Sequence, residues 1–83
     1  MRILIVDDGT LTRDRLRRII ESDGQHEVVG DAASGRAAVR VCEVLRPDLC
    51  LLDIRMPGMD GIETAQHFMT QDEPPAVIFL YRL

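Results

Sequence analysis

Residues 47–61 read PDLCLLDIRMPGMDG, and this stretch decides the fold. Its apolar run at 49–52 is short and continuous, which is typical of a strand buried on both faces of a parallel sheet. The run ends at Asp53, and a loop with the sequence Met-Pro-Gly-Met follows at 56–59. A carboxylate is therefore expected where a buried strand leaves the sheet.

A helix and a further strand are predicted after this loop. Asp60 and Glu63 have the spacing of a capping box, which predicts a helix from there to about residue 70. Its inner face is expected to be formed by Ile62, Ala65 and Met69. Pro74-Pro75 then breaks the chain, and the apolar residues 76–81 are predicted to form the last strand.

The chain begins with a second continuous apolar run, at 3–6, which ends at Asp7-Asp8. A helix is predicted at 10–21, and Asp23-Gly24 ends it. The apolar face of this helix is expected to comprise Leu11, Leu16, Ile19 and Ile20. The residues expected to face water or a partner are Arg13, Arg15, Arg17 and Arg18.

The segment between this helix and residue 47 predicts one more strand and one more helix. Residues 27–31 are predicted to form an edge strand around a short apolar pair. Ser34 is expected to cap a helix that ends at Arg46-Pro47, because the residue before a proline disfavours the α region. Alternating strands and helices predict an α/β fold: a parallel sheet with right-handed crossovers and helices on both faces.

Three aspartates follow two of the predicted strands. Asp7 and Asp8 end the first strand, and Asp53 ends the third. In a flavodoxin-like sheet these two strands are neighbours, so the carboxylates would converge at one edge. Charges 4 Å apart repel by about 4 kcal/mol near a protein surface, and a hard cation such as Mg2+ would offset that repulsion. An ionised, exposed Asp53 beside such a cation would be a nucleophile toward phosphorus, although each aspartate alone could equally be a turn or cap residue.

Composition limits the other functions. The 83 residues fit one small domain, and the net charge of −4 argues against a nucleic-acid-binding surface. We find no apolar run long enough to span a membrane and expect no leader peptide. Cys42 and Cys50 are interpreted as reduced, buried thiols of a cytoplasmic protein, and His26 and His67 as surface residues.

Two segments carry a resemblance to a known family. Residues 3–8, Ile-Leu-Ile-Val-Asp-Asp, and the stretch 47–61 resemble the signature segments of response-regulator receiver domains, which have a CheY-like fold. The Asp-Ile-Arg-Met-Pro form at 53–57 and the arginine-rich first helix are most similar to receivers attached to LytTR-type DNA-binding domains, such as regulators of the alginate type. The resemblance covers nearly the whole chain.

The resemblance implies a role for each site residue. Asp53 would accept a phosphoryl group from a sensor histidine kinase. Asp8 and Asp53 would bind Mg2+ directly, whereas Asp7 would act largely through water. The backbone carbonyl of Arg55 would be a further metal ligand, and the Pro57-Gly58 pair would shape the loop beside the site. The resemblance implies a phosphoacceptor module rather than an enzyme, and one that regulates transcription in a full-length protein.

The chain departs from the family pattern after its third helix. The family places a Ser or Thr near the end of the fourth strand, where Tyr81 stands here, and a Lys after a fifth strand, whereas all 10 basic residues of this chain are Arg. We therefore expect residues 1–83 to be a partial receiver domain, truncated after strand four and without an output domain. We also expect the fourth strand, which lacks a second neighbour, to pair two copies into a homodimer.

Two other functions remain open. A fragment that binds a partner but carries no phosphate is one alternative, since the hydroxyl and the lysine that would contact the phosphoryl group are missing. A phosphatase of the haloacid dehalogenase type is a remote one, because those enzymes need Asp-x-Asp and Arg55 stands two residues after Asp53. A dinucleotide-binding domain is disfavoured, because no G-x-G-x-x-G follows the first strand.

Overall fold

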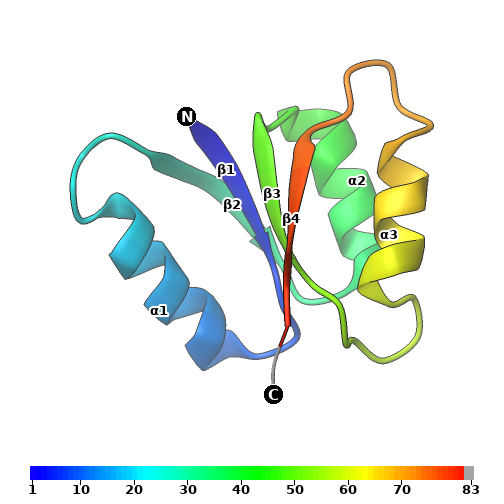
Figure 1. The fold of residues 1–83 in the computed structure, drawn as a ribbon, viewed down its shortest axis with the longest axis horizontal. Helices are drawn as coiled ribbons and strands as arrows, with labels where there is room; N and C mark the ends of the chain where they lie inside the picture. Colours follow the sequence, from blue (N-terminus) through cyan, green and yellow to red (C-terminus); the bar gives the residue numbers. More distant parts are fainter. Residues whose placement is uncertain (82–83) are drawn as a thin grey trace.

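A computed structural model describes residues 1–81, which form one sheet flanked by helices (Figure 1). The strands are β1 (Arg2–Val6), β2 (Glu27–Ala32), β3 (Leu49–Asp53) and β4 (Ala76–Leu80). The helices are α1 (Thr10–Glu21), α2 (Gly35–Leu45) and α3 (Gly61–Phe68). The strand order is β2-β1-β3-β4, and every neighbouring pair is parallel. The predicted flavodoxin-like sheet is therefore confirmed, with β2 at its edge.

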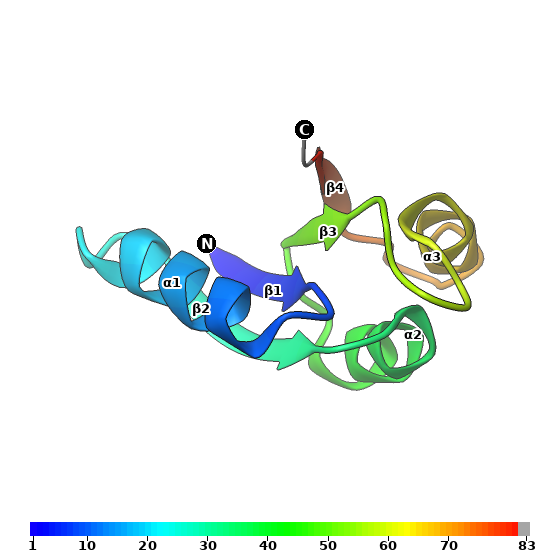
Figure 2. The same ribbon diagram turned by 90° about the horizontal axis from the view of Figure 1, so that it is seen from below.

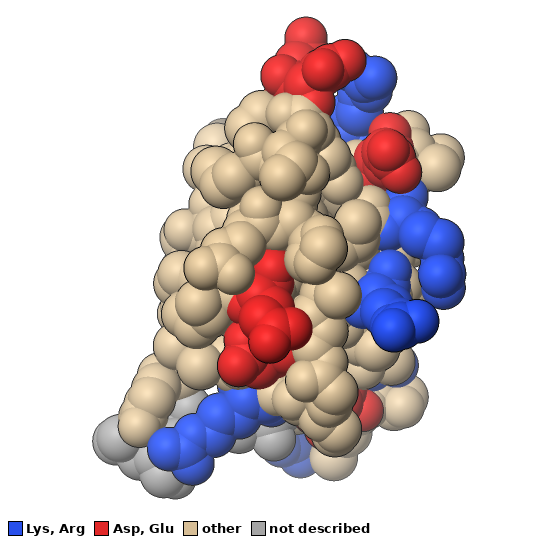
Figure 3. Space-filling view, turned by 90° about the vertical axis from the view of Figure 1, so that its right-hand side faces the viewer, with Lys and Arg blue, Asp and Glu red and all other residues tan. Residues whose placement is uncertain are grey.

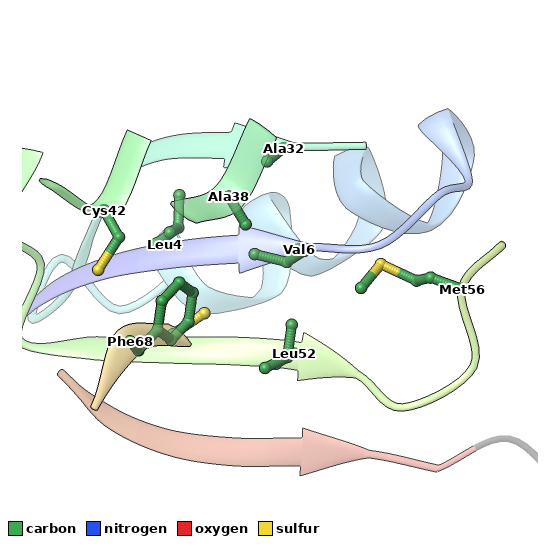
Figure 4. Close-up of a cluster of buried hydrophobic side chains, with 9 residues drawn as sticks. Leu4, Val6, Ala32, Ala38, Cys42, Leu52, Met56 and Phe68 are labelled. Carbon is green, nitrogen blue, oxygen red and sulfur yellow. The ribbon is translucent and has the colours of Figure 1, made fainter. Parts of the chain in front are cut away.

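The helices cover the two faces of the sheet unequally (Figure 2). α2 and α3 share one face, where nine buried side chains pack together (Figure 4): Leu4, Val6, Ala32, Ala38, Cys42, Cys50, Leu52, Met56 and Phe68. α1 lies on the other face and packs against β1 and β2, over a smaller cluster of Ile3, Ile5 and Val28. Among residues 1–81, no helix therefore covers the β3–β4 part of that face.

The predicted starts of α2 and α3 and the predicted end of α2 agree with the structure, whereas α3 ends at Phe68, before the predicted end at about residue 70. The Ser34 side chain accepts a hydrogen bond from the amide of Ala37 at 3.2 Å and so caps α2. α2 ends at Arg46, which has a left-handed φ of 48°. The α region is disfavoured there because Pro47 follows. At the start of α3, Asp60 accepts from the amide of Glu63 at 2.9 Å.

The buried faces of two helices differ from the prediction. In α3, Ala65 packs against the core as predicted, but Ile62 and Met69 are exposed and the buried side chains are Thr64 and Phe68. The reason is the contact of Gly61 with the end of β3, which sets the rotation of the helix about its axis. In α1, Leu16 and Ile20 pack on the sheet as predicted, but Leu11 and Ile19 face outward.

The remaining expectations from composition are confirmed where the structure tests them. Cys42 and Cys50 are free and buried, and His26 and His67 are exposed. Within the part of the chain that the structure describes, no helix is both long and apolar enough to cross a bilayer.

Burial raises the pKa of both thiols, and the nearby Glu43 adds to this effect at Cys42. We expect neither cysteine of the native protein to react with a maleimide at pH 8, because the thiolate is the reactive form. An unfolded thiol ionises near pH 8.5 whereas the folded thiols do not, so the free energy of unfolding should decrease as the pH rises above about 8.5. Mass spectrometry can measure the rate of maleimide labelling. Labelling of the native protein at the same rate as in denaturant would contradict this prediction.

Candidate acidic site at the carboxyl edge of the sheet

The acidic site follows from the pairing of β1 with β3. Val6 lies beside Leu52 in the parallel register, so the next residue of each strand reaches the same edge of the sheet. These residues are Asp7 and Asp53, and Asp8 follows Asp7. Carboxylate oxygens of all three aspartates lie within 4.8 Å of one another. The structure thus brings together the three aspartates that the sequence singled out.

Burial distinguishes the three carboxylates. Asp8 is exposed, whereas Asp7 and Asp53 are each only 1% exposed. The low exposure of Asp53 differs from the expectation of an open nucleophile. Its physical cause is the position of Asp53 in the sheet, because it ends a central strand and pairs with Leu80 of β4. A reactant must therefore pass between the loops around Asp53 to reach its carboxylate.

Backbone amides orient the two buried carboxylates. Asp7 Oδ1 accepts from the amide of Gly9 at 2.8 Å, and Asp53 Oδ1 accepts from the amide of Arg55 at 3.0 Å. In both turns an aspartate binds the amide two residues later, which is a common local arrangement for this side chain. These bonds offset part of the cost of burying a carboxylate and fix its orientation.

Arg13 supports the site from α1, contrary to the expectation that it faces water or a partner. Its Nη1 donates to the backbone carbonyl of Asp7 at 2.7 Å, and its Nε lies 3.7 Å from Asp31 Oδ2. The Arg13 side chain is only 14% exposed. Arg13 lies three residues before Leu16 and seven before Ile20, so helical spacing places it on the side of α1 that packs on the sheet. Arg15 and Arg18 lack that spacing, which was the available signal for this contact.

Two glycines allow α3 to lie close to the end of β3 and to α2. A Cβ atom on Gly61 would collide with the carbonyl of Asp53 and lie 2.8 Å from Ile54 Cα. A Cβ on Gly35 would collide with the hydroxyl of Thr64. Both glycines directly follow a capping residue, where any good helix former would fit the sequence pattern. A glycine in that place was therefore the available signal of these close contacts.

The loop after β3 carries a contact between Arg55 and Tyr81. Arg55 Nη2 donates to Tyr81 Oη at 3.1 Å, and Arg55 Cζ lies 5.3 Å from the centroid of the ring. Tyr81, which directly follows β4, therefore contacts a cation of the β3 loop. Gly58 has a left-handed φ of 74°, which is consistent with a role of Pro57-Gly58 in shaping this loop. The metal-ligand role of the Arg55 carbonyl stays a prediction.

The chemistry of the acidic site suits a hard cation. The three side chains offer only oxygen ligands, which Mg2+ prefers, and their carboxylates lie within 4.8 Å of one another. At about 4 Å each pair of carboxylates would repel by about 4 kcal/mol near a protein surface. A bound divalent cation would remove that repulsion, so the residues present fit such an ion.

Comparisons with known proteins agree with this geometry. The response regulator receiver domain family matches residues 3–81. The positive alginate biosynthesis regulatory protein of Pseudomonas aeruginosa is 45% identical over 80 residues, which are 95% of this chain and 32% of that protein. A protein-glutamate methylesterase/protein-glutamine glutaminase of Alkalilimnicola ehrlichii is 42% identical over 79 residues, 95% of this chain and 20% of that protein. The chain thus spans a third or less of the length of these relatives.

Solved structures show the same fold. The response regulator domain of Thermotoga maritima CheB superposes with a TM-score of 0.92 at 38% identity, over 98% of this chain and 60% of that one. A chain of the CheX-CheY-BeF3-Mg+2 complex from Borrelia burgdorferi has a TM-score of 0.89 at 35% identity, over 100% of this chain and 63% of that one. By sequence and by fold, the chain belongs to the response regulator receiver domain family.

Proposed function

We propose that this chain is the phosphoacceptor module of a two-component response regulator, phosphorylated on Asp53 by a histidine kinase in the presence of Mg2+. The observation that carries the proposal is the cluster of Asp7, Asp8 and Asp53, whose carboxylates lie within 4.8 Å of one another in a chain of the receiver family. The solved relative from Borrelia burgdorferi, described as a complex with BeF3 and Mg+2, supports it.

We assign the metal ligands as follows. Asp8 and Asp53 would bind Mg2+ directly, the backbone carbonyl of Arg55 would be a third protein ligand, and Asp7 would act through water. When bound, Mg2+ would neutralise charge on the phosphoryl oxygens. The amide of Gly9 holds the Asp7 carboxylate in place at 2.8 Å, which would orient it toward the metal's water shell.

The proposed transfer is a displacement at phosphorus. A carboxylate oxygen of Asp53 forms a bond to the phosphorus of a phosphohistidine, and the phosphorus–nitrogen bond breaks. The electron pair of that bond remains on the imidazole nitrogen, which then takes a proton from solvent. The amide of Arg55, 3.0 Å from Asp53 Oδ1, holds the carboxylate in one orientation during the attack. The product is an acyl phosphate on Asp53.

In a longer protein this module would regulate transcription through an output domain, as the printed name of the Pseudomonas relative suggests for that protein. We propose that residues 1–83 are a partial receiver domain, bind no nucleic acid themselves and act in the cytoplasm. The net charge is −4, and acidic side chains interrupt the basic ones on the face shown in Figure 3. The two free, buried thiols suit a reducing compartment. The receiver itself would not be an enzyme, although some relatives carry the name of one.

A second candidate function is an interaction module that carries no phosphate. The exposure of Asp53, only 1%, is the observation that favours it, because a buried carboxylate is a poor target for a phosphodonor. Phosphorylation of Asp53 decides between the two candidates.

We further propose that two copies pair through β4. In the described part of the chain β4 is an edge strand, and an edge presents unpaired N–H and C=O groups to another strand. Ile78 is 50% exposed and Phe79 40% exposed, and residues 76–81 contain no charge. Antiparallel pairing of two β4 strands about a two-fold axis would satisfy both edges and close the assembly.

The first prediction concerns the metal site. We expect weak Mg2+ binding in calorimetry, and the substitution Asp8→Asn should reduce the affinity about tenfold or more, because it removes a charged ligand. Asp72→Asn is the matched control, since it makes the same charge change in the exposed loop before β4, at the other end of the sheet. Equal affinities of the wild type and Asp8→Asn would contradict the assigned site.

The second prediction concerns phosphorylation. Incubation with Mg2+ and a small phosphodonor should add one phosphoryl group in intact mass, labile to hydroxylamine and absent from Asp53→Asn. We expect a low yield and a small change in shape, because Tyr81 stands where the family has the Ser or Thr that would contact the phosphoryl group. The matched control Asp23→Asn should be phosphorylated like the wild type. Efficient phosphorylation with a large structural change that depends on Asp53 would contradict this prediction.

The third prediction concerns self-association. Sedimentation across the micromolar range should show a dimer of the wild type and a monomer of Ile78→Arg, because a charge in the middle of β4 opposes pairing. Val44→Arg is the control, since Val44 is 80% exposed on α2 and lies outside the proposed interface. A wild type that stays a compact monomer, with β4 amides protected from exchange, would refute the interface.

A further inference from the structure

The contact between Arg55 and Tyr81 joins the two loops that border the acidic site. Arg55 follows β3 and Tyr81 follows β4, and they are 26 residues apart in the sequence. The guanidinium donates to the phenol oxygen at 3.1 Å and lies over the ring, with Cζ 5.3 Å from its centroid. Tyr81 is 59% exposed, and an exposed contact of this kind is weak. Tyr81 therefore holds the guanidinium in place, but a partner that forms a stronger hydrogen bond can replace Tyr81.

Short backbone links connect this pair to Asp53. The amide of Arg55 donates to Asp53 Oδ1 at 3.0 Å. Leu80, the residue before Tyr81, pairs with Asp53 in the register of the sheet, and its carbonyl accepts from the amide of Ile54 at 3.2 Å. The turn that orients the Asp53 carboxylate thus also carries the cation that Tyr81 holds.

The charge of the site gives this cation a function. A phosphoryl group approaching Asp53 brings negative charge toward three clustered carboxylates. Arg13 is already engaged by the Asp7 carbonyl and by Asp31, and its side chain is only 14% exposed. Arg55 is exposed, and among residues 1–81 its guanidinium makes the weak contact with Tyr81 described above. A planar guanidinium forms charge-assisted, two-pronged hydrogen bonds with phosphoryl oxygens, which are stronger than a bond to a neutral phenol.

We propose that Arg55 contacts the phosphoryl oxygens of a donor that reaches Asp53, and that Tyr81 is the positioning residue that holds the guanidinium at the rim beforehand. This inference rests on the proposed function, since it names a substrate-contacting residue for the same transfer. With acetyl phosphate as donor, an Asp53 oxygen bonds to phosphorus, the bond from phosphorus to the acetate oxygen breaks, and acetate leaves with the electron pair. The guanidinium of Arg55 would then leave Tyr81 and bind the transferred phosphoryl group.

The test measures the rate of phosphorylation and the affinity for Mg2+. If Arg55 had a purely structural role, its substitution would not change these two quantities in opposite directions. Arg55→Ala should slow phosphorylation by acetyl phosphate about fivefold, because a charge-assisted contact to the phosphoryl group is lost. The same substitution should tighten Mg2+ binding about twofold, because a positive charge leaves the neighbourhood of the carboxylates. Arg55→Lys should give an intermediate rate, since it keeps the charge but not the planar fork. Arg18→Ala, which removes the same charge at the far end of α1, should change neither quantity.

Tyr81 provides an independent readout. It is the only tyrosine of a chain without tryptophan, so protein fluorescence reports on this residue alone. Adding Mg2+ and beryllofluoride, an inert analogue of the phosphoryl group, should change the emission of the wild type but not that of Arg55→Ala. Tyr81→Phe should slow phosphorylation about twofold, because it keeps the ring and loses one neutral hydrogen bond.

The outcomes separate the two proposals. A wild type that acetyl phosphate does not modify at Asp53 would overturn both the proposed function and this inference. Modification of Asp53 at equal rates in the wild type and Arg55→Ala would overturn the inference alone. Three results for Arg55→Ala would together support the contact of Arg55 with the phosphoryl group. Its phosphorylation is slower than that of the wild type, its Mg2+ binding is tighter, and its tyrosine emission does not change when beryllofluoride is added.

Discussion

The pairing of β1 with β3 is the constraint on which the acidic site depends. Residues adjacent in this register leave the sheet at the same edge, so the strand-end aspartates meet although they are far apart in the sequence. The pairing itself depends on the chain passing through α1, β2 and α2 before it returns beside β1. β2 occupies the other side of β1, and the crossover leaves only one side open to β3. The topology, rather than any local motif, therefore concentrates the negative charge.

Burying two of these carboxylates carries a cost that the surrounding turns offset. Asp7 and Asp53 each receive a backbone amide, and the Asp7 carbonyl receives the guanidinium of Arg13. Such bonds lower the cost of desolvation. Oxygen ligands grouped in this way suit a divalent cation, because Mg2+ prefers oxygen ligands and would neutralise part of their charge.

The sequence predicted the features that local rules determine. Continuous apolar runs identified the strands, and the caps Ser34 and Asp60 identified two helix starts. The burial of Asp53 was not predicted, because it depends on the neighbouring strands and on the approach of Gly61. The contact of Arg13 with the Asp7 carbonyl was also missed, since it depends on how α1 is rotated on the sheet. Local patterns place residues on elements, whereas packing decides which atoms they contact.

An edge strand of the described sheet, β4, borders the acidic site. β4 pairs only with β3 in the described part of the chain, and on the α1 side of the sheet no described helix covers it. Elements with few buried contacts open at low free energy, so Tyr81 and the guanidinium that it holds should share the mobility of β4. A strand added to the β4 edge would reduce that mobility and stabilise the contact between Arg55 and Tyr81. Pairing at the edge and chemistry at Asp53 would then be coupled through the register that places Leu80 beside Asp53.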